Sequence, residues 1–347
     1  MRERILAIRL RALGDVVLTT PALRSLRRGH PGAALDVVTE RAYAPLLESV
    51  PGIERVWPLD RTASSTLELI GRLRREGYTL AVDFFGNPRS AFITAWCGAR
   101  HTAGYELRGR RLAYRTRVPR VAATAVGRAE YAAAAHVRLA LAVGGVEDGL
   151  DARLTLAARA REEADRALAR AGITDPHLTV GLVPAGTWAT KTWPLSHFAL
   201  LARRLLGAGR RLLAMCGPGE EDAASRLSRM APGIATLPVC DVATLAALVA
   251  RLGAVVGTDS GPRHLAAAFG VPTFTWFGPA LPEIWTPPGE QHGYWFTALP
   301  CRGCNRTACP HWNCLPELSP TRAVELVLGH LDRHARSTAG LDTAARA

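Results

Sequence analysis

The segment Thr179-Val-Gly-Leu-Val-Pro-Ala-Gly-Thr-Trp-Ala-Thr-Lys-Thr-Trp-Pro194 contains the pattern that decides the fold. Its first five residues predict a short buried strand, the Pro/Gly/Thr residues predict a loop, and Pro194 begins a run with helical apolar spacing. Lys191 is the only lysine of the chain; the other 42 of its 43 lysine and arginine residues are arginines. An ammonium can hold one oxygen in a confined site where a guanidinium cannot, and a helix N-terminus attracts anions. We therefore expect Lys191 to hold a phosphate; the alternative is a chance survivor on a polar loop.

The same order of strand, loop and helix recurs along both halves of the chain. The predicted strands are residues 5–10, 35–39, 53–59, 79–84, 178–183, 211–216, 234–237, 254–257 and 273–277. The predicted helices are residues 15–28, 42–50, 67–76, 90–97, 128–143, 195–206, 221–230, 242–251, 262–269 and 321–334. This alternation predicts an α/β protein with two Rossmann-like, doubly wound parallel sheets. Residues 1–172 and 173–334 are the predicted domains, joined through a charged helix at 157–171 and a loop at 172–177, with a frayed tail at 335–347.

Composition limits the class of protein. An apolar content of 48% in 347 residues indicates globular domains, and no run approaches the roughly 20 apolar residues of a membrane span. The N-terminus lacks the layout of a signal peptide, so we expect a cytoplasmic protein. The net charge of +13 favours contact with anionic membrane or phosphorylated substrates. Nucleic acid is disfavoured, since basic residues form one block only, at Arg108, Arg110, Arg111, Arg115, Arg117 and Arg120.

Several polar residues directly follow predicted strands, at the sheet edge where open α/β folds bind ligands. Gly14 and Asp15 open the first helix without GxGxxG spacing, which argues against a dinucleotide there. Asp15 either caps the helix or presents a carboxylate able to accept a proton. In the second half, Asp259, Ser260 and Gly261 begin a helix that also contains His264. They form either a diphosphate cradle or an ordinary capped turn.

Glu220 follows another strand of the second half. It either binds a ribose or is an ordinary acid at a helix start. In the first half Asp83 and Arg89 flank a strand end and are candidates for binding an acceptor, with a solvated Arg89 as the alternative.

Three stretches resemble the family 9 glycosyltransferases, the heptosyltransferases of lipopolysaccharide core assembly. They are residues 5–23 (Ile-Leu-Ala-Ile-Arg-Leu-Arg-Ala-Leu-Gly-Asp-Val-Val-Leu-Thr-Thr-Pro-Ala-Leu), the Lys191-Thr-Trp-Pro194 loop, and Thr258-Asp-Ser-Gly-Pro-Arg-His-Leu265. The resemblance implies a GT-B architecture, with two Rossmann-like domains facing across a cleft. It also implies inverting transfer of a sugar, typically heptose from ADP-heptose, to a lipopolysaccharide-core or similar glycolipid at the inner face of the membrane.

The resemblance also implies roles for individual residues. Asp15 would be the general base, and Lys191 with Thr187 would hold the donor phosphates. Asp259 and the amides of Ser260 and Gly261 would bind the donor sugar and diphosphate, and Glu220 would bind the ribose. Pro262 and Arg263 depart from the residues that the family often has. With lysine and amides at the diphosphate, we expect no cofactor and no catalytic metal.

Other functions stay open at this point. They are transfer or epimerisation of another nucleotide-sugar in the same fold, and a non-catalytic module that binds nucleotides or polyanions. A cysteine cluster, Cys301, Cys304, Cys309 and Cys314, is interpreted either as a structural zinc site or as cysteines without metal, reduced or disulfide-bonded.

Overall fold

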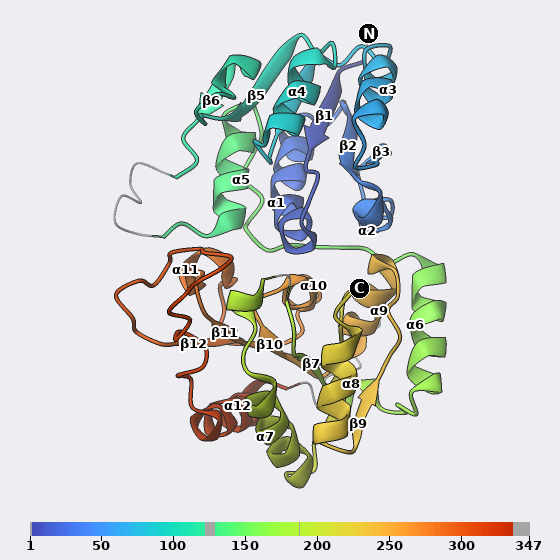
Figure 1. Ribbon diagram of the computed structural model, residues 1–347. Helices are drawn as coiled ribbons and strands as arrows, with labels where there is room; N and C mark the ends of the chain where they lie inside the picture. The colour runs from blue at the N-terminus through green and yellow to red at the C-terminus, as the bar shows by residue number, and fades with distance from the viewer. Residues whose placement is uncertain (1, 122–128, 187, 336–347) are drawn as a thin grey trace. The chain divides into compact units, whose positions relative to one another are not determined.

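The computed structural model describes residues 2–121, 129–186 and 188–335, and its contacts divide the chain into two compact units, Met1–Ala157 and Ala158–Ala347 (Figure 1). The division falls earlier than the predicted boundary after residue 172. Helix α6 (Ala158–Arg170), predicted as part of a linker, packs against α9 (Val242–Arg251) of the second unit. Three alanines of α6 are buried in this contact, so the helix belongs to that unit. The predicted tail lies outside the described residues from 336 onward.

The first unit is built on a parallel sheet that has, within the described residues, six strands in the order β3-β2-β1-β4-β5-β6. The strands are β1 (Arg4–Ile8), β2 (Ala34–Glu40), β3 (Arg55–Leu59), β4 (Leu80–Asp83), β5 (His101–Tyr105) and β6 (Thr116–Val118). This is the strand order of a Rossmann fold, which confirms the predicted architecture. The sequence missed β5 and β6. β6 is the edge strand and β5 lies next to it; both are short and lack the apolar run that reveals a central strand.

Helices cover both faces of this sheet because apolar residues alternate along its strands. Ile5 and Ala7 of β1 pack toward α1 (Leu13–Gly29) and α5 (Ala132–Leu141). Leu6 and Ile8 pack toward α3 (Ala63–Leu73) and α4 (Pro88–Trp96). The short helix α2 (Ala44–Leu47) follows β2. Two separate cores therefore hold the carboxyl end of β1 rigidly between them.

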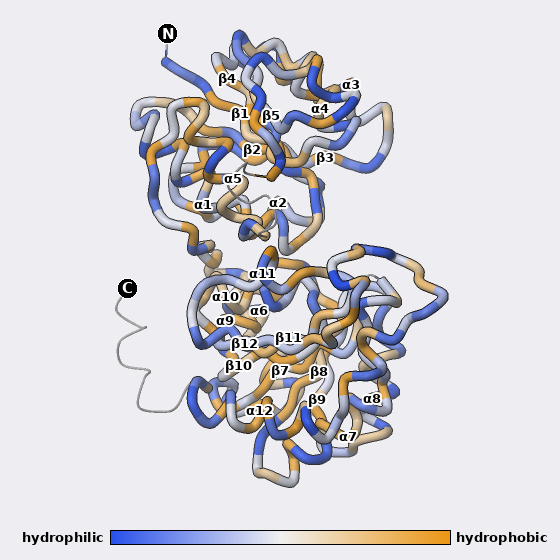
Figure 2. The backbone as a smooth tube through the Cα atoms, turned by 90° about the vertical axis from the view of Figure 1, so that its left-hand side faces the viewer, coloured by the Kyte–Doolittle hydropathy of each residue, from blue (hydrophilic) through white to orange (hydrophobic). Residues whose placement is uncertain are grey.

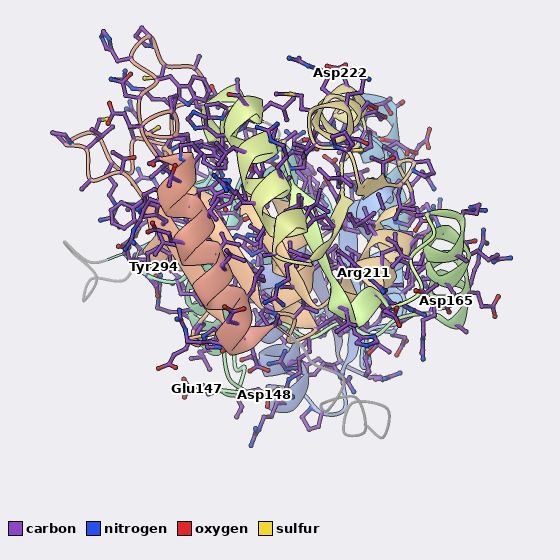
Figure 3. The ribbon with its side chains drawn as sticks, turned by 90° about the horizontal axis from the view of Figure 1, so that it is seen from below. Glu147, Asp148, Asp165, Arg211, Asp222 and Tyr294 are labelled. Atoms are coloured by element: carbon purple, nitrogen blue, oxygen red, sulfur yellow. The ribbon has the colours of Figure 1, made fainter. Side chains whose placement is uncertain are left out.

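The second unit repeats the design, with the order β12-β11-β10-β7-β8-β9 and only parallel pairs among its described strands. Its strands are β7 (Thr179–Val183), β8 (Arg211–Ala214), β9 (Ile234–Thr236), β10 (Ala254–Thr258), β11 (Thr273–Phe277) and β12 (His292–Phe296). The sequence missed β12, an edge strand in which aromatic residues are partly exposed. Tyr294 is 42% exposed and reaches the surface (Figure 3).

The strands of this sheet are apolar on both faces (Figure 2). One face packs against α7 (Leu195–Gly207), α8 (Glu221–Met230) and α12 (Pro320–His334), around Trp193, Phe198 and Trp276. Helices α6, α9 and α10 (Gly261–Ala268) cover the other face, and the short α11 (Pro282–Trp285) follows β11. Consequently the loops after β7 and β10 leave the sheet toward opposite faces.

Two buried histidines make the stability of the second unit sensitive to acid. His292 begins β12 and His330 lies in α12; they are 6% and 3% exposed. Burial, followed by nearby positive charge, lowers the pKa of each to about 4. An unfolded histidine titrates near pH 6.5. Below that pH the unfolded chain binds more protons than the folded chain, so stability is lost as pH falls from about 6.5 toward 4.

We predict that urea unfolding between pH 7 and pH 5 shows a free energy of unfolding that decreases with acidity. Each of the two histidines contributes up to about 1.4 kcal/mol per pH unit. His330→Gln should reduce this slope, whereas the exposed His311→Gln serves as the matched control and should leave it as in the parent. A slope unchanged by His330→Gln would contradict the prediction.

Candidate functional site

The polar residues of the second unit meet where its strand order reverses. Strands β7 and β10 are neighbours, with Gly257 paired to Val183, and their following helices lie on opposite faces. Such a switch point is where doubly wound sheets bind ligands. Gly257 has a φ of 149°, and a Cβ there would lie 2.4 Å from the carbonyl oxygen of Val183. Glycine at this position lets the two strand ends approach closely.

Lys191 and Asp259 join the two loops at this point. The Lys191 ammonium donates to Asp259 Oδ2 at 2.6 Å. The Asp259 side chain is 4% exposed and that of Lys191 is 18% exposed. The ammonium also lies 4.8 Å from the centre of the Trp188 ring and 5.9 Å from that of Trp285. A compact cation is thus held between a carboxylate and two aromatic faces.

Arg263 is a site residue that the sequence did not single out. It is buried one helical turn after Asp259, and its Nη2 lies 3.4 Å from Asp259 Oδ1 and donates to the carbonyl oxygen of Trp285 at 2.5 Å. Burial alone would raise the pKa of Asp259, but Lys191 and Arg263 outweigh it and hold that pKa below its ordinary value.

His264 lies in the interior beside the same pair. It is 5% exposed and its ring lies 6.2 Å from that of Trp285. Burial and the neighbouring Arg263 lower its pKa well below the ordinary value. His264 is therefore a neutral group at neutral pH, next to the predicted donor site and largely shielded from solvent.

The start of α10 offers further hydrogen-bonding groups. Ser260 is the N-cap and Gly261 the first helical residue. Thr258 Oγ1 and Ser260 Oγ are shielded from solvent and make no hydrogen bond within the described part of the chain. Buried hydroxyls without partners are costly in a folded protein, and these two flank Asp259 in the chain.

Glu220 and Thr187 were also predicted at the donor site. Glu220 follows β8, next to β7 on the same sheet edge, and its Oε2 accepts from the Gly217 amide at 2.9 Å. Thr187 lies outside the described residues.

Asp15 occupies the equivalent switch point of the first unit. Arg9, at the end of β1, donates to the carbonyl oxygen of Phe84 at 2.7 Å and lies 2.5 Å from Asp15 Oδ1. The Arg9 side chain is 3% exposed, whereas that of Asp15 is 25% exposed. Gly14 is buried at the start of α1, and Asp15 Oδ2 accepts from the Ala12 amide at 3.4 Å. Asp15 thus has the weak helix contact of a cap and also a carboxylate oriented by a buried cation.

Asp83 is placed in the interior, not at a surface open to an acceptor. It is 0% exposed, and its oxygens accept from Ser90 Oγ, the Tyr114 hydroxyl and the amides of Phe85 and Gly86, at 2.6–2.9 Å. Burial raises its pKa, although these donors oppose the rise. With four donors in place, Asp83 fixes the loop after β4.

Arg89 is likewise occupied. Its guanidinium donates to Thr66 Oγ1 at 2.8 Å, to the carbonyl oxygen of Thr62 at 2.9 Å and to that of Asp60. These contacts tie the start of α4 to the loop before α3. Arg89 is therefore not a freely solvated arginine, and its role at an acceptor stays a prediction.

The cysteine cluster shows no ligand geometry. All four thiols are free; Cys301 and Cys304 are exposed, and Cys309 and Cys314 are partly buried. Within the described residues no three His, Cys, Asp or Glu side chains come together as ligands for a metal ion. The zinc interpretation stays a prediction without a site in this arrangement.

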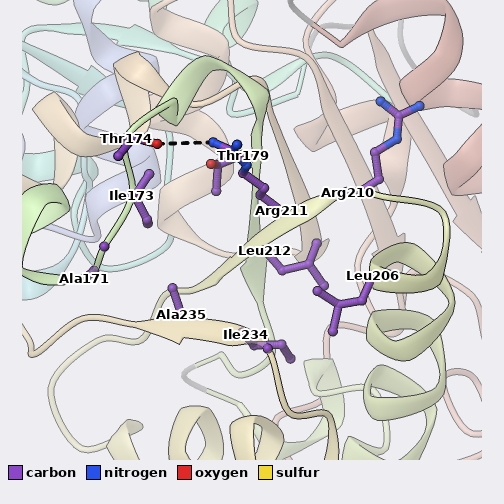
Figure 4. Close-up of a pocket in the computed structure, with 12 residues that line it drawn as sticks. Ala171, Ile173, Thr174, Thr179, Leu206, Arg210, Arg211, Leu212, Ile234 and Ala235 are labelled. Atoms are coloured by element: carbon purple, nitrogen blue, oxygen red, sulfur yellow. Dashed lines mark hydrogen bonds between the residues drawn. The ribbon is translucent and has the colours of Figure 1, made fainter.

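A pocket of about 540 Å³ in the second unit lies away from these residues. It is lined at the opposite, amino edge of the sheet by the starts of β7, β8 and β9, including Thr179, Arg211 and Ile234 (Figure 4). Parallel α/β sheets bind ligands at the other edge, so this pocket is not the candidate site.

Two Rossmann-like units, one with a cation and one with a carboxylate at its switch point, have the architecture of GT-B glycosyltransferases. The model of glycosyltransferase family 9 (heptosyltransferase) matches residues 66–314. Lipopolysaccharide heptosyltransferase 1 of Pseudomonas aeruginosa is 30% identical over 328 residues, covering 89% of this chain and 88% of that protein. The chain belongs to glycosyltransferase family 9, and it is a heptose-transferring glycosyltransferase of lipopolysaccharide biosynthesis.

Solved structures show the same fold. A family 9 glycosyltransferase from Veillonella parvula has a TM-score of 0.83 at 20% identity, covering 95% of this chain and 98% of that one. An Escherichia coli heptosyltransferase solved with ADP has a TM-score of 0.72 at 22% identity, covering 94% and 99%. These comparisons confirm the predicted family, fold class and enzyme class. They do not support the alternative interpretation as a non-catalytic module.

We predict that Tyr114→Phe, which removes one donor to the buried Asp83, lowers the free energy of unfolding by about 1–3 kcal/mol. Because Tyr114 lies in the first unit, the affinity for ADP should stay within twofold of the parent. Chemical denaturation and calorimetric titration measure the two effects. A raised KM for the acceptor at unchanged stability would instead assign Asp83 to acceptor binding.

Proposed function

We propose that the protein transfers heptose from ADP-heptose, with inversion at the anomeric carbon, to a hydroxyl of a lipopolysaccharide-core glycolipid. The observation that carries this proposal is the Lys191–Asp259 pair at the switch point, beside the amides of α10 and two buried hydroxyls without partners. These groups suit a diphosphate. The ADP held by the Escherichia coli heptosyltransferase of the same fold supports the choice of nucleotide.

In this proposal Lys191 carries the phosphate charge. An ammonium has three donors, and Asp259 accepts from one at 2.6 Å. The remaining N–H groups can bind the donor diphosphate, together with the amides at the start of α10. In this arrangement Asp259 orients Lys191. This role differs from the direct contact with the donor sugar that the family resemblance implies. Lysine and amides supply the positive charge needed on the departing diphosphate, so the proposed step requires no metal ion.

Asp15 is the proposed general base. Its carboxylate accepts the proton of the acceptor hydroxyl as that oxygen forms a bond to the anomeric carbon. The bond from the anomeric carbon to the diphosphate oxygen breaks on the opposite side, and ADP leaves with the electron pair. Arg9 fixes the orientation of the carboxylate through the 2.5 Å contact. A positioned base of this kind contributes about 10²–10⁴-fold to the rate.

We predict that substitutions at the two centres separate binding from chemistry. Lys191→Ala should weaken ADP binding by more than about tenfold, or about 1.4 kcal/mol. Asp15→Asn should leave ADP affinity within twofold while lowering kcat by about 10²–10⁴-fold. Calorimetry with ADP, UDP and GDP and turnover of ADP-heptose measure both.

The control for Lys191→Ala is Lys191→Arg. It keeps the positive charge but not the compact shape, so it should not restore ADP binding fully. Transfer at the parental rate by Asp15→Asn would remove Asp15 as the base. Preference for UDP or GDP over ADP would instead favour a different nucleotide-sugar.

We further propose that the protein works peripherally at the inner face of the cytoplasmic membrane, where its glycolipid acceptor resides. None of the helices in the described ranges has both the length and the apolar character needed to cross a bilayer. The first unit, however, exposes Leu112 by 93%, Trp96 by 55% and Phe92 by 43%. Exposed large apolar side chains grouped on one surface mark an interaction site.

Basic residues surround these apolar side chains. Helix α4, which carries Phe92 and Trp96, contacts the short turn Arg111–Ala113, which carries Leu112. A hollow of about 410 Å³ there is lined by Phe92 together with Arg108 and Arg110. We call residues 92, 96 and 108–112 the basic–apolar face. Aromatic rings at the headgroup level combined with arginines match an anionic bilayer surface.

We predict that the protein binds vesicles of phosphatidylglycerol and phosphatidylethanolamine in co-sedimentation, and that binding weakens as salt is raised. The double substitution Trp96→Ser with Leu112→Ser should weaken binding by at least about tenfold, because each side chain loses apolar contact with lipid. Leu178→Ser, at an exposed leucine of the second unit (43%), is the control. Equal loss in both variants, or binding to neutral vesicles alone, would contradict the basic–apolar face.

A further inference from the structure

The segment that carries the cysteine cluster is fixed to the second unit without helix or strand of its own. Residues 297–319 connect β12 to α12. Leu315 and Leu318 are 0% and 2% exposed in the core, and the carbonyl oxygen of Leu318 accepts from Trp193 Nε1 at 3.2 Å. Nearer its start, the Asn305 amide donates to the carbonyl oxygen of Pro279 at 3.0 Å. A segment of this length in a compact domain is usually functional.

This segment contacts the turn that carries Lys191. Thr190 Oγ1 donates to the carbonyl oxygen of Arg306 at 2.7 Å, and Trp312 Nε1 donates to the carbonyl oxygen of Thr190 at 3.2 Å. Thr190 is 4% exposed. Both hydrogen bonds reach the residue that immediately precedes the lysine, one through its side chain and one through its backbone.

Two backbone hydrogen bonds close the turn itself, from the Lys191 amide to the carbonyl oxygen of Trp188 at 2.9 Å and from the Thr192 amide to that of Ala189 at 3.1 Å. It is a single turn of 3₁₀ helix, Ala189–Lys191, whose N-cap makes no side-chain hydrogen bond. Behind it lies Gly278, where a Cβ would be 2.9 Å from the carbonyl oxygen of Thr190. The backbone at Thr190 is therefore confined between Gly278 and residues 306 and 312. This confinement sets the starting point of the Lys191 side chain, which must reach Asp259 at 2.6 Å.

We infer that Thr190 and Trp312 are positioning residues for Lys191, through which residues 297–319 set the affinity of the donor phosphate site. The inference rests on the proposed function, in which Lys191 holds the diphosphate. A long lysine side chain loses considerable entropy when it is held in one geometry. A fixed backbone limits that loss to the side chain itself, and a small displacement of the turn moves the ammonium away from the position that the phosphate needs.

The test removes each hydrogen bond with little change of shape. Trp312→Phe and Thr190→Val should each raise the Kd for ADP by about fivefold, the effect of one lost hydrogen bond. The KM for the sugar donor should rise in parallel, while kcat with a saturating donor should change less. Thr190→Ser keeps the hydroxyl and should restore the affinity. Trp295→Phe, a partly buried tryptophan on β12 that packs against the same core, is the matched control and should leave the Kd unchanged.

A double-mutant cycle with Lys191→Ala distinguishes positioning from general destabilisation. If Trp312 acts through Lys191, Trp312→Phe should add less than about twofold to the Kd in the Lys191→Ala background. An equal effect in both backgrounds, or an effect that Trp295→Phe reproduces, would overturn the inference. A Lys191→Ala variant that binds ADP as the parent does would overturn the proposed function itself. If Lys191→Ala binds ADP weakly while Trp312→Phe and Thr190→Val bind it as the parent does, only the positioning role is overturned.

Discussion

The ion pair between Lys191 and Asp259 is the constraint on which the second unit's site depends. Both charges are largely removed from water, so each would be costly to bury alone, and their 2.6 Å contact offsets that cost. The pair also joins the loops after β7 and β10, which diverge to opposite faces of the sheet. In a chain whose other basic residues are all arginines, a lysine here is explained by the shape of the space between Trp188, Trp285 and the carboxylate.

The two units contain the same arrangement with opposite polarity. In the first, the cation of the pair is the buried partner: Arg9 is 3% exposed and presents Asp15, which is 25% exposed. In the second, the anion is the buried partner: Asp259 is 4% exposed and presents Lys191, which is 18% exposed. One sheet edge therefore offers a negative group and the other a positive group. A proton acceptor and a phosphate-binding cation need this difference, and two copies of one fold supply it by exchanging which partner is buried.

Much of this arrangement could be predicted from the sequence, for a physical reason. Asp15, Lys191 and Asp259 follow strands that are apolar throughout, and parallel strands bring their carboxyl ends to one edge. The edge strands β6 and β12, and β5 beside β6, escaped detection because strands at or next to an edge need no continuous apolar run. Arg9 and Arg263 escaped because burial of an arginine depends on partners in the fold, which sequence does not reveal among so many surface arginines. Asp83 and Arg89 were expected at an acceptor; local donors and the distant Tyr114 occupy Asp83, and residues 60–66 occupy Arg89, partners that the two residues' own sequence context does not show in full.

The chemistry of the second unit extends beyond the repeated Rossmann elements. Residues 297–319 are held by Leu315 and Leu318 in the core. In the described part of the chain, their hydrogen bonds to the Lys191 turn are made with Thr190. Arg306 lies between Cys304 and Cys309, and Trp312 between Cys309 and Cys314. The two contacts with Thr190 therefore come from the two intervals between these cysteines. Because Thr190 directly precedes Lys191, the path of this stretch of chain and the start of the Lys191 side chain are fixed at the same residue.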